Sequence, residues 1–522
     1  MNRVTDPLPA LRRYWGYDSF RPLQQRIIHS LLSGRDTCVV MPTGGGKSLC
    51  YQLPAVVLEG TVVVISPLIA LMQDQVAQLR QMGIPAAVLN STLPGKQQFE
   101  VMQAARKGAF RLLYLSPERL ARPDTTEWLR HVPVSFFAID EAHCISEWGH
   151  EFRPEYRQLS RLRTEFPERP IAAFTASATR RVRHDILEQL QLRDPHKYIA
   201  SFYRQNLRYV AKETDAVSQP QLLVRALRQL GDGNAIVYSP TIARVEQTVD
   251  RLQEEGIPSV AYHGKMETEE RRRNQERWMS DEVRVLVGTI AFGLGINKAA
   301  VRAVIHLALP KSLEQYYQEA GRAGRDGRPA DCILLWQKRD TALLAHFIGQ
   351  IEDPAEKQRA WQRYRDIRDF AESHSCRHRQ VCRHFGETPK WTSCGVCDAC
   401  GSEPGWLKLP AAEELRRRTR WKPESPPAAP GTMAAPGRRA AEIDQALRDY
   451  LREWRRSTAR EQRIPAYIVL HDSSLEELCR VRPRTLRDLT GVTGFGKRKV
   501  ELYGRQILDA LARFHRDRGW RQ

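Results

Sequence analysis

Short apolar runs alternate with helix-length amphipathic stretches from the N-terminal region to about residue 335. Continuous apolar runs bounded by turn residues are typical of strands in parallel sheets, whose two faces are both covered by helices. The alternation therefore predicts an α/β fold. The expected strands are residues 37–40, 62–65, 112–115, 136–139, 172–175, 235–238, 285–287 and 303–306.

The same pattern divides the chain into units. Two sets of phosphate-type motifs indicate two parallel-sheet domains, joined near residues 201–206. The stretch PESPPAAPGTMAAPG is rich in Pro and Ala, which favours an extended linker over a packed core. Helical periodicity resumes at Ile443, Leu447 and Leu451, so a small all-α domain is expected to follow. The expected units are the α/β domains 1–203 and 204–338, a helical cysteine-rich subdomain 339–402, the linker 403–440 and the helical domain 441–516.

Charge changes this picture, because the 522 residues carry a net charge of +20 with a pI near 9.7. Residues 401–522 hold 26 Lys and Arg against 16 Asp and Glu, so half of the excess lies in under a quarter of the chain. The net charge indicates a polyanionic partner such as nucleic acid or an anionic membrane, and its uneven distribution favours a binding tail over a charge that serves solubility alone. No secretory signal and no membrane-length apolar run is visible. Five of the ten cysteines are scattered and only the cluster within residues 376–400 has ligand-like spacing, which indicates a reducing, cytoplasmic setting.

A glycine-rich segment, MPTGGGKS at residues 41–48, follows the first expected strand and precedes a helical stretch. Its three glycines let backbone N–H groups approach phosphate oxygens. Lys47 can neutralise the β- and γ-phosphates, and Ser48 can bind magnesium. The strict phosphate-loop pattern has Gly where this chain has Met41. A glycine-rich surface turn with a solvated Lys is therefore the alternative.

Two adjacent carboxylates, Asp140 and Glu141, follow the apolar run 134–139. At the end of a strand such a pair suits a magnesium–nucleotide site, where one carboxylate holds the metal and the other orients or deprotonates water. Ordinary acids at a helix N-terminus are the alternative.

An aromatic and cationic set, Trp148, Phe152 and Arg153, lies shortly after these carboxylates. Aromatic rings and guanidinium planes stack on the exposed bases of single strands. A hydrolysis site would thus be joined by one short loop to a single-strand sensor, which is the layout of a motor.

The segment QEAGRAGRDG at residues 318–327 carries two arginines, Arg322 and Arg325. Arginines three apart share a helix face, so both are expected to point into one cleft. There they would stabilise the transferring phosphoryl group as arginine fingers. A salt-bridged helix end on the surface is the alternative.

Four cysteines have metal-ligand spacing: Cys376, Cys394, Cys397 and Cys400. Four thiolates suit structural zinc, and an iron–sulfur cluster is the alternative, although the C-x₃-C-P continuation of ferredoxins does not follow. Cys382 is interpreted as a packing residue. The neighbouring histidines, which are expected to be exposed, are His374, His378 and His384.

The C-terminal segment GVTGFGKRKV places Lys497, Arg498 and Lys499 after glycines at a helix start. Backbone amides and positive charges in that arrangement can bind the phosphates of DNA. A glycine-rich helix–turn–helix with solvated bases is the alternative.

Together these segments resemble the RecQ-type DNA helicases of superfamily 2 over about residues 10–402, in order and spacing. The segments that carry the resemblance are FRPLQ at 20–24, MPTGGGKS at 41–48, SPLIALMQDQV at 66–76, YLSPERL at 114–120, residues 140–156, FTASAT at 174–179, TIAFGLGINKAAVR at 289–302 and QEAGRAGRDG at 318–327. Residues 464–499 resemble the HRDC domain of helicases. Met41 is ordinary for this superfamily.

The resemblance implies two RecA-like motor domains, a zinc-binding subdomain and an HRDC-like domain, with ATP, Mg²⁺ and Zn²⁺ as cofactors. It implies that Arg21 and Gln24 read the adenine, with Tyr17 stacking nearby. The implied phosphate and magnesium contacts are Thr43, Gly44, Gly45, Gly46, Lys47 and Ser48. Asp140 would hold magnesium through water and Glu141 would be the catalytic base. The four clustered cysteines become zinc ligands.

The implied activity is 3′→5′ translocation on single-stranded DNA and unwinding of forked DNA, in repair, recombination, replication and the SOS response. A monomer in the cytoplasm, associated with the nucleoid, is expected, with single-strand-binding or recombination proteins as partners and no membrane. Only residues 403–440 lie where the family has a winged helix, and their composition cannot form a core. The rival functions are a translocase with weak strand separation, a zinc-stapled DNA-binding protein with an inactive motor, and an RNA helicase.

Overall fold

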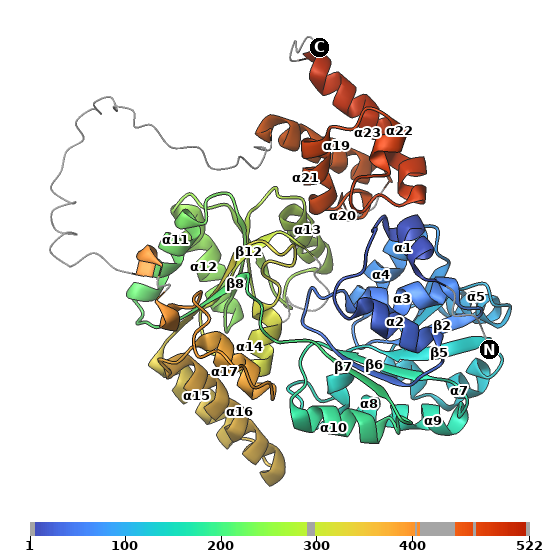
Figure 1. Ribbon diagram of the computed structural model, residues 1–522. Helices are drawn as coiled ribbons and strands as arrows, with labels where there is room; N and C mark the ends of the chain where they lie inside the picture. The colour runs from blue at the N-terminus through green and yellow to red at the C-terminus, as the bar shows by residue number, and fades with distance from the viewer. Residues whose placement is uncertain (1–5, 290–297, 402–403, 408–443, 463–465, 518–522) are drawn as a thin grey trace.

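The computed structural model describes residues 6–289, 298–401, 404–407, 444–462 and 466–517 (Figure 1). The first α/β domain contains a seven-stranded sheet in the order β3-β4-β2-β5-β6-β1-β7, and every pairing is parallel. Its strands are β1 Thr37–Val40, β2 Thr61–Ile65, β3 Ala86–Leu89, β4 Leu112–Leu115, β5 Val134–Ile139, β6 Ile171–Thr175 and β7 His196–Ile199. Its helices are α1 Leu8–Trp15, α2 Gln24–Leu32, α3 Lys47–Val57, α4 Ile69–Gln81, α5 Gly95–Arg106, α6 Pro117–Leu120, α7 Pro123–Leu129, α8 Pro154–Arg157, α9 Arg161–Glu165 and α10 Arg180–Gln189.

The second α/β domain is built around a six-stranded parallel sheet in the order β10-β11-β9-β12-β13-β8. Its strands are β8 Leu207–Glu213, β9 Asn234–Tyr238, β10 Ser259–Tyr262, β11 Val285–Gly288, β12 Val301–His306 and β13 Ala330–Trp336. Its helices are α11 Ser218–Gln229, α12 Ile242–Glu254, α13 Thr268–Met279 and α14 Leu313–Ala320. The connection between the sheets, residues 200–206, includes the joint expected from the sequence.

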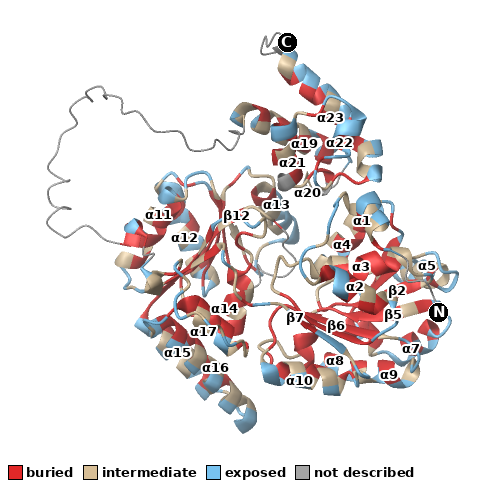
Figure 2. Cartoon of the chain, viewed as in Figure 1, coloured by how far each residue is buried: buried red, intermediate tan, exposed pale blue. Residues whose placement is uncertain are grey.

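The expectation of two parallel-sheet domains is confirmed, and each of the eight expected strands forms. Five further strands were not expected, namely β3, β7, β8, β10 and β13. Four of these lie at the edges of the two sheets. Strands in the centre of a parallel sheet are buried on both faces, as Figure 2 shows, whereas an edge strand needs no continuous apolar run. The strand β7, for example, has the sequence HKYI and exposes three of its four residues.

A cysteine-rich unit, residues 338–401, follows the second sheet with α15 Lys338–Gly349, α16 Pro354–Glu372, α17 Arg377–His384 and the short helix η3 Asp398–Cys400. Asp398 fixes this unit in two ways. Its carboxylate pairs with Arg377 at 2.9 Å and accepts a hydrogen bond from the backbone N–H of Ala211 in β8 at 2.8 Å. The unit is therefore attached to the edge strand of the second sheet.

The C-terminal helical unit, residues 444–517, has its own core and lies over both α/β domains in Figure 1. Its helices are α19 Gln445–Gln462, α20 Ala466–Val469, α21 Asp472–Val481, α22 Leu486–Leu489 and α23 Lys497–Asp517. Across the described part of the chain, no helix is both long and apolar enough to cross a membrane.

Candidate functional site

The glycine-rich loop, residues 41–46, connects β1 to α3, and Lys47 is the first residue of that helix. We call this segment the phosphate loop. Gly44 and Gly46 have φ values of 82° and 84°, in the left-handed region that favours glycine. The ammonium of Lys47 is buried and has no hydrogen-bond partner among the described residues, although it lies 3.8 Å from Glu141 Oε1. A buried cation at a helix N-terminus fits a polyphosphate, which supplies the missing acceptors.

The residues expected at the adenine lie beside this loop. The Arg21 guanidinium donates a hydrogen bond to the carbonyl of Gly44. The amide of Gln24 donates to the carbonyls of Gly45 and Gly46, both at 3.3 Å, and Gln24 also accepts from the N–H of Arg21 at 2.9 Å. Tyr17 is 39% exposed. Arg21 and Gln24 therefore hydrogen-bond to the backbone of the phosphate loop itself.

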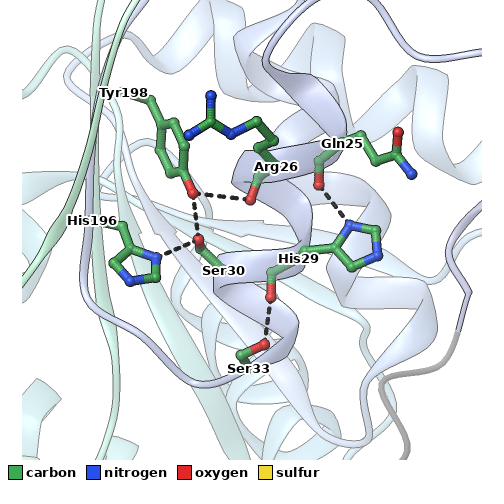
Figure 3. A pocket seen from close by; sticks show the side chains of 7 residues that line it. All are labelled: Gln25, Arg26, His29, Ser30, Ser33, His196 and Tyr198. Carbon is green, nitrogen blue, oxygen red and sulfur yellow. Dashed lines mark hydrogen bonds between the residues drawn. The ribbon is translucent and has the colours of Figure 1, made fainter.

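A polar pocket of about 390 Å³ lies between the helix α2, which begins at Gln24, and the edge strand β7 (Figure 3). Hydrogen bonds among its lining residues anchor the helix to the strand. Ser30 Oγ lies 2.7 Å from both His196 Nδ1 and Tyr198 Oη, and Tyr198 also donates to the carbonyl of Arg26. These groups satisfy one another, so the pocket positions α2 rather than taking part in the chemistry.

The carboxylate pair follows β5, next to the strand β6 and close to β1 at the same edge of the sheet. Asp140 accepts a hydrogen bond from the N–H of Glu141 at 3.0 Å, and its carbonyl accepts from the Tyr156 hydroxyl at 2.9 Å. Burial and the neighbouring Glu141 raise the pKa of Asp140 to about 6. Burial alone would also raise the pKa of Glu141, but Lys47 and His143 hold it well below its usual range.

The backbone of Glu141 is held at φ 47°, a conformation that a non-glycine residue rarely adopts. Such strain costs about 1–3 kcal/mol and persists where the surroundings enforce it, often at functional sites. One such support is His143, whose Nδ1 lies 3.2 Å from Glu141 Oε2 and 3.0 Å from Thr175 Oγ1. The carboxylate of Glu141 is thereby aimed toward Lys47 and the phosphate loop.

Arg322 and Arg325 were expected to share one face of a helix, and this is wrong. The helix α14 ends at Ala320, and both arginines lie in the turn that follows, residues 321–327, which we call the arginine turn. The turn nevertheless reaches the phosphate loop. The Thr43 hydroxyl donates to the carbonyl of Gly321 at 2.9 Å, and the side chain of Arg325 packs on Gly44, where an added Cβ would come within 3.3 Å.

A second contact joins the two α/β domains at the same place, because the Gln318 amide donates to the Ser177 hydroxyl at 2.7 Å. Burial, together with Arg322 and Arg204, lowers the pKa of Arg325 to about 9. Clustered, buried guanidinium groups create a strongly positive surface, which fits the charge of a triphosphate. The structure thus brings the phosphate loop, Glu141 and Arg325 together where the two α/β domains meet, with Arg322 beside Arg325.

Residues 142–153, which we call the aromatic loop, lie against the cysteine-rich unit. The Trp148 ring is 36% exposed, with the guanidinium of Arg181 at 3.1 Å from its centroid and that of Arg359, in α16, at 5.6 Å. Phe152 has Arg157 over its ring at 5.4 Å, and Arg153 lies 3.6 Å from Glu151. Cation–π contacts therefore hold the expected base-stacking ring.

The four predicted metal ligands come together: the Sγ atoms of Cys376, Cys394, Cys397 and Cys400 all lie within 4.8 Å of one another. The sulfurs of Cys394 and Cys400 are 3.9 Å apart. In a tetrahedral zinc site with bonds of about 2.3 Å, the sulfurs are about 3.8 Å apart. The donor set and its geometry therefore fit zinc, which would staple α17 to η3.

Two of the three neighbouring histidines are not exposed, which corrects the expectation. His378 is buried, and its ring lies between Cys394 Sγ at 3.3 Å and the carbonyl of Arg204 at 3.1 Å. His384 forms an ion pair with Glu314 of α14 at 2.7 Å. Cys382 is buried in the core, as expected for a packing residue.

Of the three basic residues at the start of α23, Arg498 lies beside the first α/β domain. Lys497 and Arg498 are exposed, but Arg498 lies 3.7 Å from the position of a Cβ on Gly83 and pairs with Glu501 at 3.2 Å. Burial and Arg455 lower the pKa of Lys499 to about 8. Their contact with DNA stays a prediction. Parts of the resembling segment 289–302 and of the expected linker lie outside the described residues.

The family comparisons divide the chain in the same way. The matches are to the DEAD/DEAH box helicase model at residues 21–186, the helicase conserved C-terminal domain at 218–327, RecQ zinc-binding at 338–401 and the HRDC domain at 444–511. Residues 402–443 therefore lie between the zinc-binding and HRDC matches, and they include the expected linker 403–440.

Two curated proteins show the relationship, and one solved structure shows the likeness of the fold. The chain is 44% identical over 397 residues to the ATP-dependent DNA helicase RecQ of Haemophilus influenzae, covering 76% of this chain and 64% of the relative. It is 35% identical to that of Pasteurella multocida over 591 residues, covering 97% and 93%. Its fold is similar to that of Mycobacterium smegmatis helicase Lhr bound to ssDNA and AMP-PNP, with a TM-score of 0.51, 20% identity and coverage of 70% and 58%.

The chain thus spans less than two thirds of the first relative but most of the second. The second alignment is longer than the 522 residues of this chain, so that relative carries residues that this chain lacks. With four family matches in the same order as the structural units, the chain belongs to the RecQ family of ATP-dependent DNA helicases.

Proposed function

We propose that the chain hydrolyses ATP in the cleft between its two sheets and uses the cycle to translocate 3′→5′ on single-stranded DNA and unwind forked duplexes. The observation that carries this proposal is the contact of Thr43 and Gly44 with Gly321 and Arg325. The phosphate loop of one domain and the arginines of the other act on the same phosphates only when the two domains close together. Nucleotide binding and domain closure are then one event.

The roles of the side chains follow from this geometry. Lys47, Arg322 and Arg325 neutralise phosphate charge that grows in the transition state. Glu141, held ionised beside Lys47, accepts a proton from the attacking water. Because an anionic nucleotide offsets the charge of Lys47, its binding raises the pKa of Glu141 and makes it a stronger base. Ser48 and Asp140 would hold a magnesium ion, Asp140 through water, and its positive charge would help to neutralise the phosphates.

The aromatic loop supports coupling to DNA. Residues 142–147 connect Glu141 directly to Trp148, and the backbone N–H of Arg153 donates to the carbonyl of Cys144 at 2.9 Å. Displacing Trp148 onto a base therefore pulls on the segment that holds the catalytic carboxylate. DNA occupancy would be sensed at the ATP site through a single short loop.

Two assays on the same preparation test the proposal. DNA-stimulated phosphate release measures the motor, and separation of a forked duplex with a 3′ single-stranded arm measures unwinding. We expect both, with no unwinding from a 5′ arm. Phosphate release without DNA stimulation would contradict the motor.

The closest rival is a translocase with weak strand separation, because residues 402–443 are too few for a winged helix. Displacement of streptavidin from biotinylated single-stranded DNA, without separation of the fork, would favour that rival.

A further inference from the structure

The arginine turn begins where α14 ends, so its carbonyls include those that a helix C-terminus leaves without intrahelical partners. Here they converge on one side chain from the connection between the sheets. Arg204 donates from Nη1 to the carbonyl of Gly321 at 2.8 Å, and from Nη2 to those of Ala323 and Gly324 at 3.0 and 2.9 Å. One guanidinium therefore binds the carbonyls of the two residues that flank Arg322 and the carbonyl of the residue before Arg325.

This placement is favourable for two reasons. A guanidinium presents several N–H donors in a fixed planar fork, which matches adjacent carbonyls better than a point charge does. A cation beside the last turn of a helix is also stabilised by the helix dipole. Arg204 thus fixes the conformation of the backbone from which Arg322 and Arg325 project.

Asn206 holds the turn from its other end. Its amide donates to the carbonyls of Gly324 and Arg328 at 2.8 and 2.9 Å. Gly324 has φ 55°, and a Cβ there would come within 2.5 Å of the Asn206 amide nitrogen. Glycine at this position is therefore required both by the backbone and by the close approach of Asn206.

The carbonyl of Gly321 joins this support to the nucleotide loop. This carbonyl oxygen accepts one hydrogen bond from Arg204 and one from the Thr43 hydroxyl of the first α/β domain. Both lone pairs of the oxygen are therefore used. The backbone of Arg204 is itself anchored, because the His378 ring donates to its carbonyl at 3.1 Å and contacts Cys394 Sγ at 3.3 Å. The turn, the connection and the cysteine cluster form one continuous set of contacts.

We propose that Arg204 is a positioning residue for ATP hydrolysis, which holds the arginine turn so that Arg322 and Arg325 reach the phosphates when the domains close. This inference rests on the proposed function. Arg204 lies in the connection between the two α/β domains, about which they would move. We therefore expect the arginine turn to move together with this connection when the domains close. Arg204 touches neither the phosphate loop nor the carboxylates through any described hydrogen bond, so it acts through the turn.

The test compares full-length Arg204→Ala and Arg204→Lys with wild type in DNA-stimulated ATP hydrolysis. A misplacement of catalytic groups by about 1 Å costs about 100-fold in rate. We therefore expect kcat to fall about 100-fold for Arg204→Ala, with KM for ATP changed less than threefold and ATPγS affinity retained. Lysine cannot span three carbonyls, so Arg204→Lys should lose less than alanine but not match wild type.

Arg208→Ala is the matched control, because Arg208 lies four residues away and pairs with Asp331 at 2.7 Å, away from the turn. It should keep the wild-type kcat. Melting temperature and zinc content are measured for every variant. If Arg204→Ala does not fold, the comparison is made with Arg204→Lys, and a wild-type kcat in that variant would overturn the proposal.

A double variant separates positioning from general destabilisation. If Arg204 acts through Arg325, then Arg204→Ala adds little to the loss caused by Arg325→Ala, since residues that act as a unit are not additive. The inference would be overturned if the loss of kcat in the double variant equals the product of the losses in the two single variants, or if Arg204→Ala keeps the wild-type kcat. Either result would leave the proposed function intact. A wild-type chain without ATP turnover would instead overturn the proposed function itself.

Discussion

At the scale of single residues, Glu141 combines a left-handed backbone with a carboxylate held between Lys47 and His143. We expect Glu141→Gln to lower ATP turnover by about 10²–10⁴-fold, because the amide cannot accept a proton from water. The amide keeps the size of the side chain, so ATP should still bind and remain bound. Steady-state hydrolysis beside equilibrium ATP binding measures both effects.

The control for this change is Glu168→Gln, which alters an exposed carboxylate of the same domain. Turnover like that of wild type in Glu141→Gln would show that another group is the base.

Trp148 provides the second prediction at this scale. Its ring contacts Arg181 and Arg359, and no described contact links it to the phosphate loop. We expect Trp148→Ala to leave ATP binding unchanged while DNA stimulation of ATP hydrolysis falls at least tenfold, since base stacking is worth about 1–3 kcal/mol per base. Full stimulation in this variant, measured with saturating single-stranded DNA, would refute the sensor role.

The sequence predicts the members of the site better than their setting. Lys47, Asp140 and the four cysteines are readable because phosphate and metal chemistry fix both residue type and spacing. The role of Arg204 could not be predicted, because a single arginine in a connecting segment belongs to no sequence pattern. Its role depends on hydrogen bonds to carbonyls more than a hundred residues away. The prediction that Arg322 and Arg325 share a helix face was wrong because α14 ends at Ala320, and because Gly324, between the two arginines, has a positive φ.

At the scale of elements, α14 is tied to α17 by the buried pair Glu314–His384. Although burial opposes it, His384 holds the pKa of Glu314 at about 2, while Glu314 and Asp366 raise the pKa of His384. A raised histidine pKa gives stability that is complete below about pH 6.5 and is lost as pH rises through the folded value. The depressed value of Glu314 matters only below about pH 4.5.

We therefore expect the melting temperature of His384→Gln to lie furthest below wild type near pH 6 and to approach it by pH 9. His374→Gln, which changes an exposed histidine of the same unit, is the control. Thermal melts at three pH values suffice. A gap that stays constant or widens toward pH 9 would contradict the charged pair.

The cysteine cluster makes a further prediction for elements. Because zinc would join the N-terminus of α17 to η3, we expect Cys397→Ser to lose bound zinc and to expose residues 377–401 to protease. Cys382→Ser, which changes a buried cysteine outside the cluster, should keep its zinc. Zinc content and limited proteolysis measure both, and a full complement of zinc in Cys397→Ser would refute its role as a ligand.

The central strands of the two sheets could be predicted from the sequence, but the strands at the edges of the sheets could not. The strand β10, SVAY, exposes part of its surface and has no apolar run to identify it, while β13 contains CILLW and was within reach of the sequence. The domain limits expected from the sequence remain predictions.

At the scale of the whole molecule, the C-terminal helical unit bridges both α/β domains. Arg452 pairs with the buried Asp281 at 3.2 Å, and Arg456 donates to the carbonyl of Ser280 at 2.7 and 3.2 Å, both in the second domain. On the first domain, Gly496 lies so close to Tyr14 that a Cβ would come within 2.4 Å of the Tyr14 carbonyl oxygen. Opening of the ATP cleft must therefore break or strain one of these two contacts.

If the helical unit docks as one body, breaking its contact with the second domain weakens its contact with the first. We expect the double variant Arg452→Glu and Arg456→Glu to speed amide hydrogen exchange at residues 13–17, far from the substitutions, because repulsion from Asp281 replaces attraction. Arg460→Glu, an exposed site on the same helix α19, should leave that exchange unchanged. Faster exchange confined to residues 280–282 would show that each α/β domain holds the unit independently, so that closure of the cleft and docking of the unit are not coupled.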